Sequence, residues 1–189
     1  MKTALAVMAF VTASTSLASA EPADALGPAP AVSVGSFAYS MHGYLSSTPA
    51  ILTGFDATYD HDLSGSYGLR FRAGMVLLAI DEITGTAPHG EAGVFKRMPL
   101  SPRLALDASL LAGWYAGGLD HKEAWKDHGG PTVMAEVALH VALIEPLHAQ
   151  VGGGYRLAWT GDEHVSDAGS STDPFSSGPL LRFNLGLSF

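Results

Sequence analysis

The chain has 189 residues, and its 18 Asp and Glu outnumber its 10 Lys and Arg, so the formal net charge is −8. This acidic balance makes nucleic acid a poor partner for the surface as a whole. The absence of cysteine excludes a disulfide framework and thiolate–metal chemistry, and the length suits one domain.

The beginning of the chain predicts a secretory signal peptide. Lys2 precedes the apolar run 4–11, and an Ala-Ser-Ala sequence at 18–20 has the pattern of a cleavage site. The apolar run is too short to cross a hydrocarbon layer of about 30 Å, and no later stretch approaches the ~18 apolar residues of a membrane helix. The expected organisation is a signal peptide at 1–20, a flexible Pro-rich leader at 21–31 and a barrel domain at 32–189.

The rest of the chain alternates between apolar and polar residues with a period of two. This period is typical of β-strands, whereas an amphipathic helix would repeat its apolar residues every three or four positions. The segments have roughly the 9 to 11 residues of a tilted membrane strand. About eight strands are predicted, near 34–45, 50–59, 66–79, 90–98, 103–116, 132–144, 147–159 and 180–189.

The alternation assigns apolar and polar side chains to opposite faces of each strand. In the segment 132–144, Val137 and Leu139 share one face and Glu136 and His140 share the other. In a barrel the polar faces would line the interior. The residues predicted to face it are Asp56, Arg70, Arg72, Asp107, Glu136, His140, His148, Gln150, Arg156, Arg182 and Asn184.

The lengths of the connections provide an independent test, because small outer-membrane barrels have short turns at the periplasmic end and longer external loops. If the mature chain starts in the periplasm, the predicted turns are 60–65, 99–102 and 145–146. The predicted external connections are 46–49, 80–89, 117–131 and 160–179, and three of these four are long and rich in Gly, Asp, Ser and Pro.

The final strand carries the clearest resemblance to a known family. Leu181, Phe183, Leu185 and Leu187 alternate with polar or small residues, and the chain closes on Phe189. This ending resembles the C-terminal signature of bacterial outer-membrane barrels, which the assembly machinery recognises. The mature chain as a whole resembles the small OmpA-type barrels in pattern. The resemblance implies an all-β, eight-stranded, up-and-down transmembrane barrel in the outer membrane, with outer-membrane lipids and the assembly machinery as partners.

A periplasmic or secreted β-sandwich is the main alternative, because its strands also alternate and it also needs a signal peptide. Charged residues such as Arg72 and Glu136 at the centres of the polar faces favour the barrel. The order of short and long connections favours it too.

An eight-stranded barrel has an interior that side chains fill. Buried charges must be paired or hydrogen-bonded, so one interpretation is a network that plugs the lumen. The candidate network residues are Asp56, Arg70, Arg72, Asp107, Glu136, His140, His148, Arg156 and Arg182. The other interpretation is a gated polar pathway in which His140 or His148 responds to pH.

One external segment has a motif that suggests catalysis. The stretch from Glu163 resembles the H-x-S-N motif of the outer-membrane lipid A deacylases, which are barrel esterases. The resemblance implies Ser166 as nucleophile, His164 as base and an acid further on, for which Asp173 is the available residue. The match departs from the family because Asp167 replaces the Asn. A solvated loop is the alternative.

The segment 120–128 contains His and Asp residues that could bind a divalent metal, but their spacing matches no known ligand pattern. A solvated loop is again the simpler interpretation, so no metal or cofactor is predicted. The expected function is structural, or interaction through the external loops, with a narrow pore and a lipid A deacylase-like esterase as alternatives.

Overall fold

A computed structural model describes residues 30–41, 50–64, 66–80, 83–117, 128–159 and 175–189. These residues form eight strands: β1 (Ala31–Met41), β2 (Ala50–Ser64), β3 (Tyr67–Ile80), β4 (Ile83–Ser101), β5 (Leu104–Gly117), β6 (His128–Ile144), β7 (Leu147–Trp159) and β8 (Phe175–Ser188). Within the described ranges there is no helix that is both long and apolar enough to cross a membrane.

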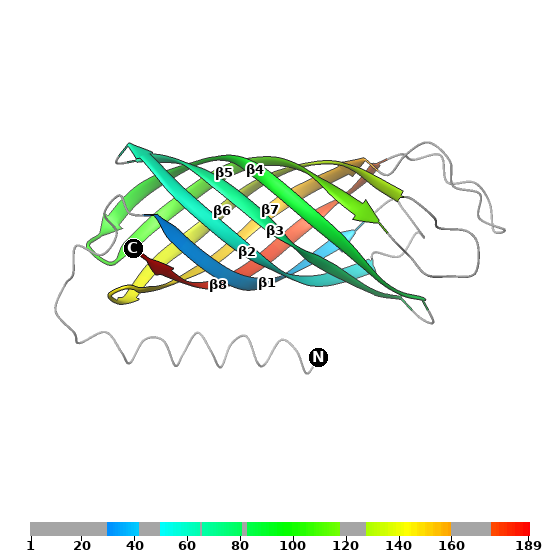
Figure 1. Cartoon of the computed structure of the whole chain (residues 1–189), viewed down its shortest axis with the longest axis horizontal. Helices are drawn as coiled ribbons and strands as arrows, with labels where there is room; N and C mark the ends of the chain where they lie inside the picture. The colour runs from blue at the N-terminus through cyan, green and yellow to red at the C-terminus, as the bar shows by residue number, and fades with distance from the viewer. Residues whose placement is uncertain (1–29, 42–49, 65, 81–82, 118–127, 160–174) are drawn as a thin grey trace.

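The strands form one closed barrel in which each strand pairs with its neighbours in the sequence, and β8 pairs with β1. All pairs are antiparallel, and the strands wrap obliquely around a common axis (Figure 1). At the closing seam Val32 lies opposite Leu187, and the backbone N–H of Phe189 donates to the carbonyl of Pro30 at 2.9 Å. The predicted all-β, eight-stranded antiparallel barrel is therefore confirmed.

The short turns lie at one end of the barrel. Residues 65–66, 102–103 and 145–146 separate β2 from β3, β4 from β5, and β6 from β7. The third turn has its predicted bounds, whereas the predicted turns 60–65 and 99–102 were placed too early because β2 continues to Ser64 and β4 to Ser101. We call this the short-turn end, and the C-terminus also lies there (Figure 1). Strands β1, β3, β5 and β7 finish at the opposite end.

The long connection predicted at 80–89 is wrong. Strand β4 already begins at Ile83, and its first residues pair with the end of β3, with Ile80 opposite Ile83 and Met75 opposite Pro88. The described pairing of β4 with β5 begins only at His89. Proline cannot donate a backbone hydrogen bond and is tolerated at strand edges, so Pro88 fits a part of β4 that pairs on one side.

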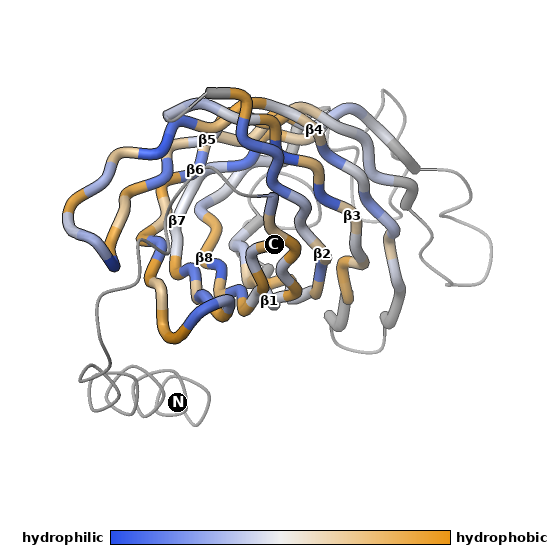
Figure 2. The backbone as a smooth tube through the Cα atoms, turned by 60° about the vertical axis from the view of Figure 1, so that its left-hand side comes forward, coloured by the Kyte–Doolittle hydropathy of each residue, from blue (hydrophilic) through white to orange (hydrophobic). Residues whose placement is uncertain are grey.

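Burial alternates along the strands with a period of two. From Pro131 to His140 on β6, odd-numbered residues are exposed and even-numbered ones are buried. Hydropathy also changes from residue to residue along single strands (Figure 2). The exposed wall is apolar and includes Phe55, Val94, Leu110, Val137, Val151 and Leu181. The barrel therefore turns its apolar faces outward and its polar faces inward.

A layer of apolar side chains also lies inside the barrel. It consists of Phe37, Leu52, Val76, Leu111, Met134 and Leu180, with Tyr39 and Ala87 packed against it. Each of these residues lies in the half of its strand that is further from the short-turn end. We call this set the apolar layer.

Candidate functional site

A network of ion pairs fills the interior of the barrel between the short-turn end and the apolar layer. Its arginines and carboxylates are almost inaccessible to solvent, and each has at least one oppositely charged partner. We call this set the interior network: Arg70, Arg72, Arg97, Arg156 and Arg182 with Asp56, Asp60, Glu91, Asp107 and Glu136. Arg97 also lies 3.7 Å from Asp62. The pairing of these arginines with carboxylates offsets the cost of removing the charges from water.

The half of the network near the short-turn end is built around Arg70 on β3. Its Nε and Nη2 donate to the two carboxylate oxygens of Asp60, both at 2.7 Å, in the bidentate geometry that arginine favours. Its Nη2 also donates to Asp107 at 3.1 Å. Asp107 in turn accepts from Nε and Nη2 of Arg97 at 2.9 and 3.0 Å. Two arginines and two aspartates therefore link β2, β3, β4 and β5.

The other half is built around Glu136 on β6. One carboxylate oxygen accepts from Arg72 at 3.2 Å, and the other accepts from Arg182 at 3.0 Å. Arg182 also pairs with Asp56 on β2. Arg70 lies 3.8 Å from Glu136 and connects the two halves. These pairs cross the interior rather than following neighbouring strands, so they bind opposite walls of the barrel together.

The network extends toward the apolar layer through Glu91 on β4. Its carboxylate oxygens lie 3.5 Å from Arg72 Nη1 and 3.4 Å from Arg156 Nη2. The guanidinium of Arg156 also lies 5.4 Å from the centre of the Tyr39 ring. Arg156 therefore joins the ionic part of the interior to an aromatic ring that packs against the apolar layer.

Aromatic rings lie close to three of the guanidinium groups in the interior network. Arg70 and Arg97 both lie near the Phe95 ring, at 4.9 and 5.1 Å from its centre. Arg182 lies 5.2 Å from the centre of the Phe37 ring. The face of an aromatic ring attracts a cation, so each ring helps to stabilise the buried guanidinium groups near it.

Two histidines lie beside each other at the short-turn end. The rings of His140 and His148 have centres 4.6 Å apart, and both residues are buried. His140 Nδ1 lies 3.6 Å from Asp107, and His148 Nδ1 lies 3.3 Å from the hydroxyl of Ser188. Gln150 and Asn184 complete this polar layer, with Asn184 Nδ2 3.5 Å from Gln150 Oε1.

Every residue predicted from the sequence to face the interior is buried there. The structure brings all the Asp, Glu and Arg residues among them into the interior network. His140 lies at its edge beside Asp107, and His148 lies beside His140 and Ser188. Sequence reasoning missed Asp60, Glu91, Arg97 and His89, which are also buried inside. The predicted end of β2 at residue 59 places Asp60 in a turn, whereas the strand continues to Ser64. A longer β2 with the same alternation would have placed it on the face of Asp56.

The residues of the predicted catalytic alternative, His164, Ser166 and Asp173, lie outside the described residues. The segment 120–128 also lies outside them, except for its last residue, His128. Among the described residues, no group of three or more His, Cys, Asp or Glu could hold a metal ion.

Comparison with solved structures identifies the fold. The attachment invasion locus protein Ail of Yersinia pestis is 13% identical, with a TM-score of 0.56, and the match covers 86% of this chain and 99% of Ail. Neisserial surface protein A is 11% identical with a TM-score of 0.58, and the match covers 85% of this chain and 97% of that protein. The N-terminal β-barrel domain of Pseudomonas aeruginosa OprF is 12% identical with a TM-score of 0.52, covering 84% and 97%.

No family model and no curated protein matches the sequence. The similarity to the solved structures is therefore one of architecture, but it extends over nearly the whole length of each barrel. The chain has the fold of the small eight-stranded outer-membrane β-barrels.

Proposed function

We propose that this protein is an integral outer-membrane barrel whose lumen is closed by its own side chains. The observation that carries the proposal is the sidedness of the wall. Val137 and Leu139 are exposed outside, whereas Glu136 and His140, their neighbours on β6, are buried inside. A soluble barrel would expose polar residues to water, whereas hydrocarbon favours the opposite arrangement.

The positions of the aromatic residues support a membrane location. Tyr59, Tyr67 and Phe189 are exposed near the short-turn end, and Trp114 and Trp159 are exposed toward the other end. Aromatic girdles of this kind lie at the two headgroup layers of outer-membrane barrels. The short-turn end is then the periplasmic end. The connections that follow β1, β3, β5 and β7 are external.

The interior network and the apolar layer together support the proposal of a closed lumen. Glu136 and its arginine partners cross the lumen. Leu111 and Met134, in the apolar layer further from the short-turn end, are almost fully buried. An ion entering this lumen would have to separate buried charges from their partners in the interior network. We therefore expect no steady ion flow through the barrel.

The proposed role is structural, or interaction with other surfaces through the external connections. The sequence places its longest connections, 118–127 and 160–174, between β5 and β6 and between β7 and β8. Phe189 follows directly after β8 and is 70% exposed, which is compatible with recognition of the C-terminus by the assembly machinery. Outer-membrane lipids would be the partners of the wall.

Planar-bilayer recording of the refolded protein tests this proposal. Insertion is first verified by heat-modifiable migration on a gel, which folded outer-membrane barrels display. We expect inserted protein with negligible steady conductance. A double variant, Arg72→Ala with Glu136→Ala, is a positive control, because it removes a pair that crosses the lumen. Large reproducible channels from the wild type would overturn the closed lumen and favour the narrow pore.

A further inference from the structure

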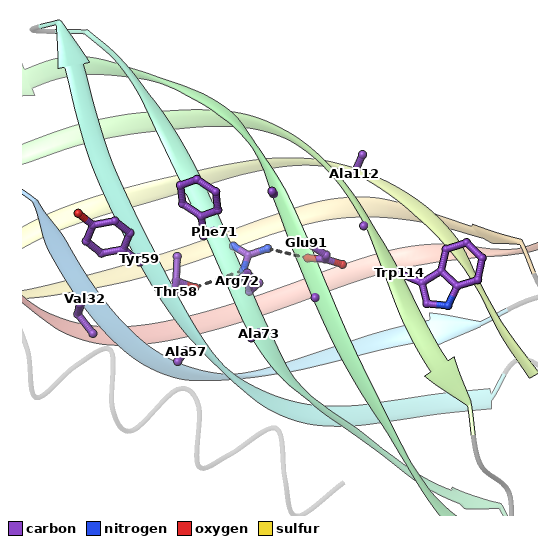
Figure 3. A pocket seen from close by; sticks show the side chains of 13 residues that line it. Val32, Ala57, Thr58, Tyr59, Phe71, Arg72, Ala73, Glu91, Ala112 and Trp114 are labelled. Carbon is purple, nitrogen blue, oxygen red and sulfur yellow. Dashed lines mark hydrogen bonds and ion pairs between the residues drawn. The ribbon is translucent and has the colours of Figure 1, made fainter.

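The outer wall has a hollow over strands β2 to β5. Its volume is about 590 Å³, and small outward-facing residues form its floor: Ala57, Ala73, Gly90, Ala92 and Ala112. Tyr59 and Phe71 stand at one side of the hollow and Trp114 at the other (Figure 3). The volume lies within the range of roughly 300 to 1,000 Å³ that small-molecule sites occupy.

The hollow arises because small residues are neighbours across the strands. Ala57 pairs with Ala73, and Ala73 pairs with Gly90. A Cβ atom added to Gly90 would meet nothing closer than the carbonyl oxygen of Arg72 at 4.0 Å. Open space therefore lies above Gly90, while the wall on β6 and β7 carries exposed residues as large as Val137 and Leu157.

We propose that this hollow binds an acyl chain of a phospholipid, a proposal that rests on the membrane location proposed above. The floor offers only Cβ and backbone atoms to an occupant, so an apolar ligand fits it. A specific protein partner needs roughly 1,000 Å² of contact, far more than five small residues provide. A slim, flexible chain fills such a hollow without requiring a complementary rigid surface.

The distribution of charge on the same wall identifies the periplasmic leaflet as the source of the lipid. Lys96 lies on β4, exposed on the outer face, with its Nζ 5.4 Å from the centre of the Tyr67 ring near the short-turn end. It is the only lysine among the described residues. Six residues separate it from Gly90, which is about 20 Å along a strand. A phosphate at Lys96 therefore leaves room for an acyl chain that runs along β4 into the hollow.

The opposite end of this wall is unfavourable for an anionic lipid. Among the described residues, no exposed Lys or Arg that could bind a phosphate lies at that end. Phosphorylated lipopolysaccharide in the outer leaflet is therefore the less favoured occupant. The proposal commits to a phospholipid with its phosphate at Lys96 and its chain over Gly90.

Native mass spectrometry of the folded full-length mature chain tests this proposal. The protein is reconstituted with an equal mixture of phosphatidylglycerol and phosphatidylethanolamine, then released and weighed with the lipid that it retains. Gly90→Phe fills the hollow without a backbone clash. Ala135→Phe adds the same side chain at an exposed position on β6, away from the hollow, and is the matched control. Lys96→Gln removes the cation.

We expect the wild type and Ala135→Phe to retain phospholipid, and both Gly90→Phe and Lys96→Gln to lose it. Equal retention by the wild type and Gly90→Phe would overturn the hollow as the site. Loss in Gly90→Phe with full retention in Lys96→Gln would overturn the placement of the headgroup. Heat-modifiable migration of each variant separates these results from a failure of the proposed function: a wild type that does not insert into membranes overturns both proposals, whereas one that inserts but retains no lipid overturns this one alone.

Discussion

The guanidinium of Arg72 on β3 and the carboxylate of Glu136 on β6 lie 3.2 Å apart across the interior of the barrel. Three strand-to-strand steps separate β3 from β6 around the wall. The contact therefore links two walls that share no backbone hydrogen bonds.

Replacing Glu136 by Gln should destabilise the folded barrel by about 3 kcal/mol, the usual cost of breaking a buried ion pair. Arg72 and Arg182 would lose a charged partner while remaining buried. The measurement is the urea concentration at which half of the vesicle-inserted protein is unfolded, with unfolding monitored by gel mobility. Glu145→Gln, in the exposed turn between β6 and β7, is the control and should leave the midpoint unchanged. Identical midpoints for the two variants would show that the ion pairs of Glu136 do not stabilise the folded barrel.

Two glycines should respond in opposite ways to replacement by alanine. A Cβ at Gly35 would collide with the side chain of Asn184 and the carbonyl of Phe183 at the seam between β1 and β8. A Cβ at Gly90 would meet open space. We expect Gly35→Ala to reduce the yield of folded barrel strongly and Gly90→Ala to keep it, as measured by the heat-modifiable band. Normal folding of Gly35→Ala would indicate that the seam is looser than described.

Leu110 and Leu111 are adjacent on β5 and face opposite sides of the wall. Leu111 is 1% exposed in the apolar layer, whereas Leu110 is 56% exposed on the outer wall. Leu111→Ala should cost about 2 to 5 kcal/mol because it leaves a cavity in a packed interior. Leu110→Ala should cost much less, because lipid chains fill the space. A larger loss for Leu110→Ala in urea unfolding would contradict the assignment of the two faces.

A charge introduced on the outer wall should destabilise the barrel more, the closer it lies to the middle of the membrane. Val137 lies in the middle of β6, and Leu63 lies next to the end of β2 at the short-turn end. Arginine at the midplane of a membrane costs roughly 2 to 4 kcal/mol, and near the interface roughly 0 to 1 kcal/mol. Val137→Arg should therefore unfold at lower urea concentration than Leu63→Arg. Equal effects would indicate a wall that faces water along its whole length.

The two-residue alternation predicted the fold well because each strand has one face toward the interior and the other on the outer wall. Successive side chains of a strand point to opposite faces, so the sequence pattern alone places Glu136 inside the barrel and Val137 outside. Strand β4 was harder. Phe95 points inward and Lys96 points outward, so its apolar residues do not mark one face. Its first residues, with Thr, Gly and Pro, also have the composition of a loop.

The partners within the interior network could not be predicted from the sequence. Whether Arg72 reaches Glu91, Glu136 or Asp56 depends on the strand register and on how far each guanidinium extends across the lumen. The pairs that cross the barrel join residues far apart in the chain; Arg182 and Asp56, for example, are 126 positions apart. The hollow at Gly90 could not be predicted from the sequence either, because it depends on four strands placing small residues side by side.

The most direct test of the central claim is to measure which solvent the outer wall contacts. The chain has no native cysteine, so Val137→Cys, Leu157→Cys and the turn variant Glu145→Cys can each carry a single spin label. In vesicles, the labels at 137 and 157 should collide strongly with oxygen, which concentrates in lipid, and weakly with a water-soluble nickel chelate. The label at 145 should show the reverse. If the nickel chelate reaches positions 137 and 157 as freely as position 145, the apolar wall does not face lipid and the account is wrong.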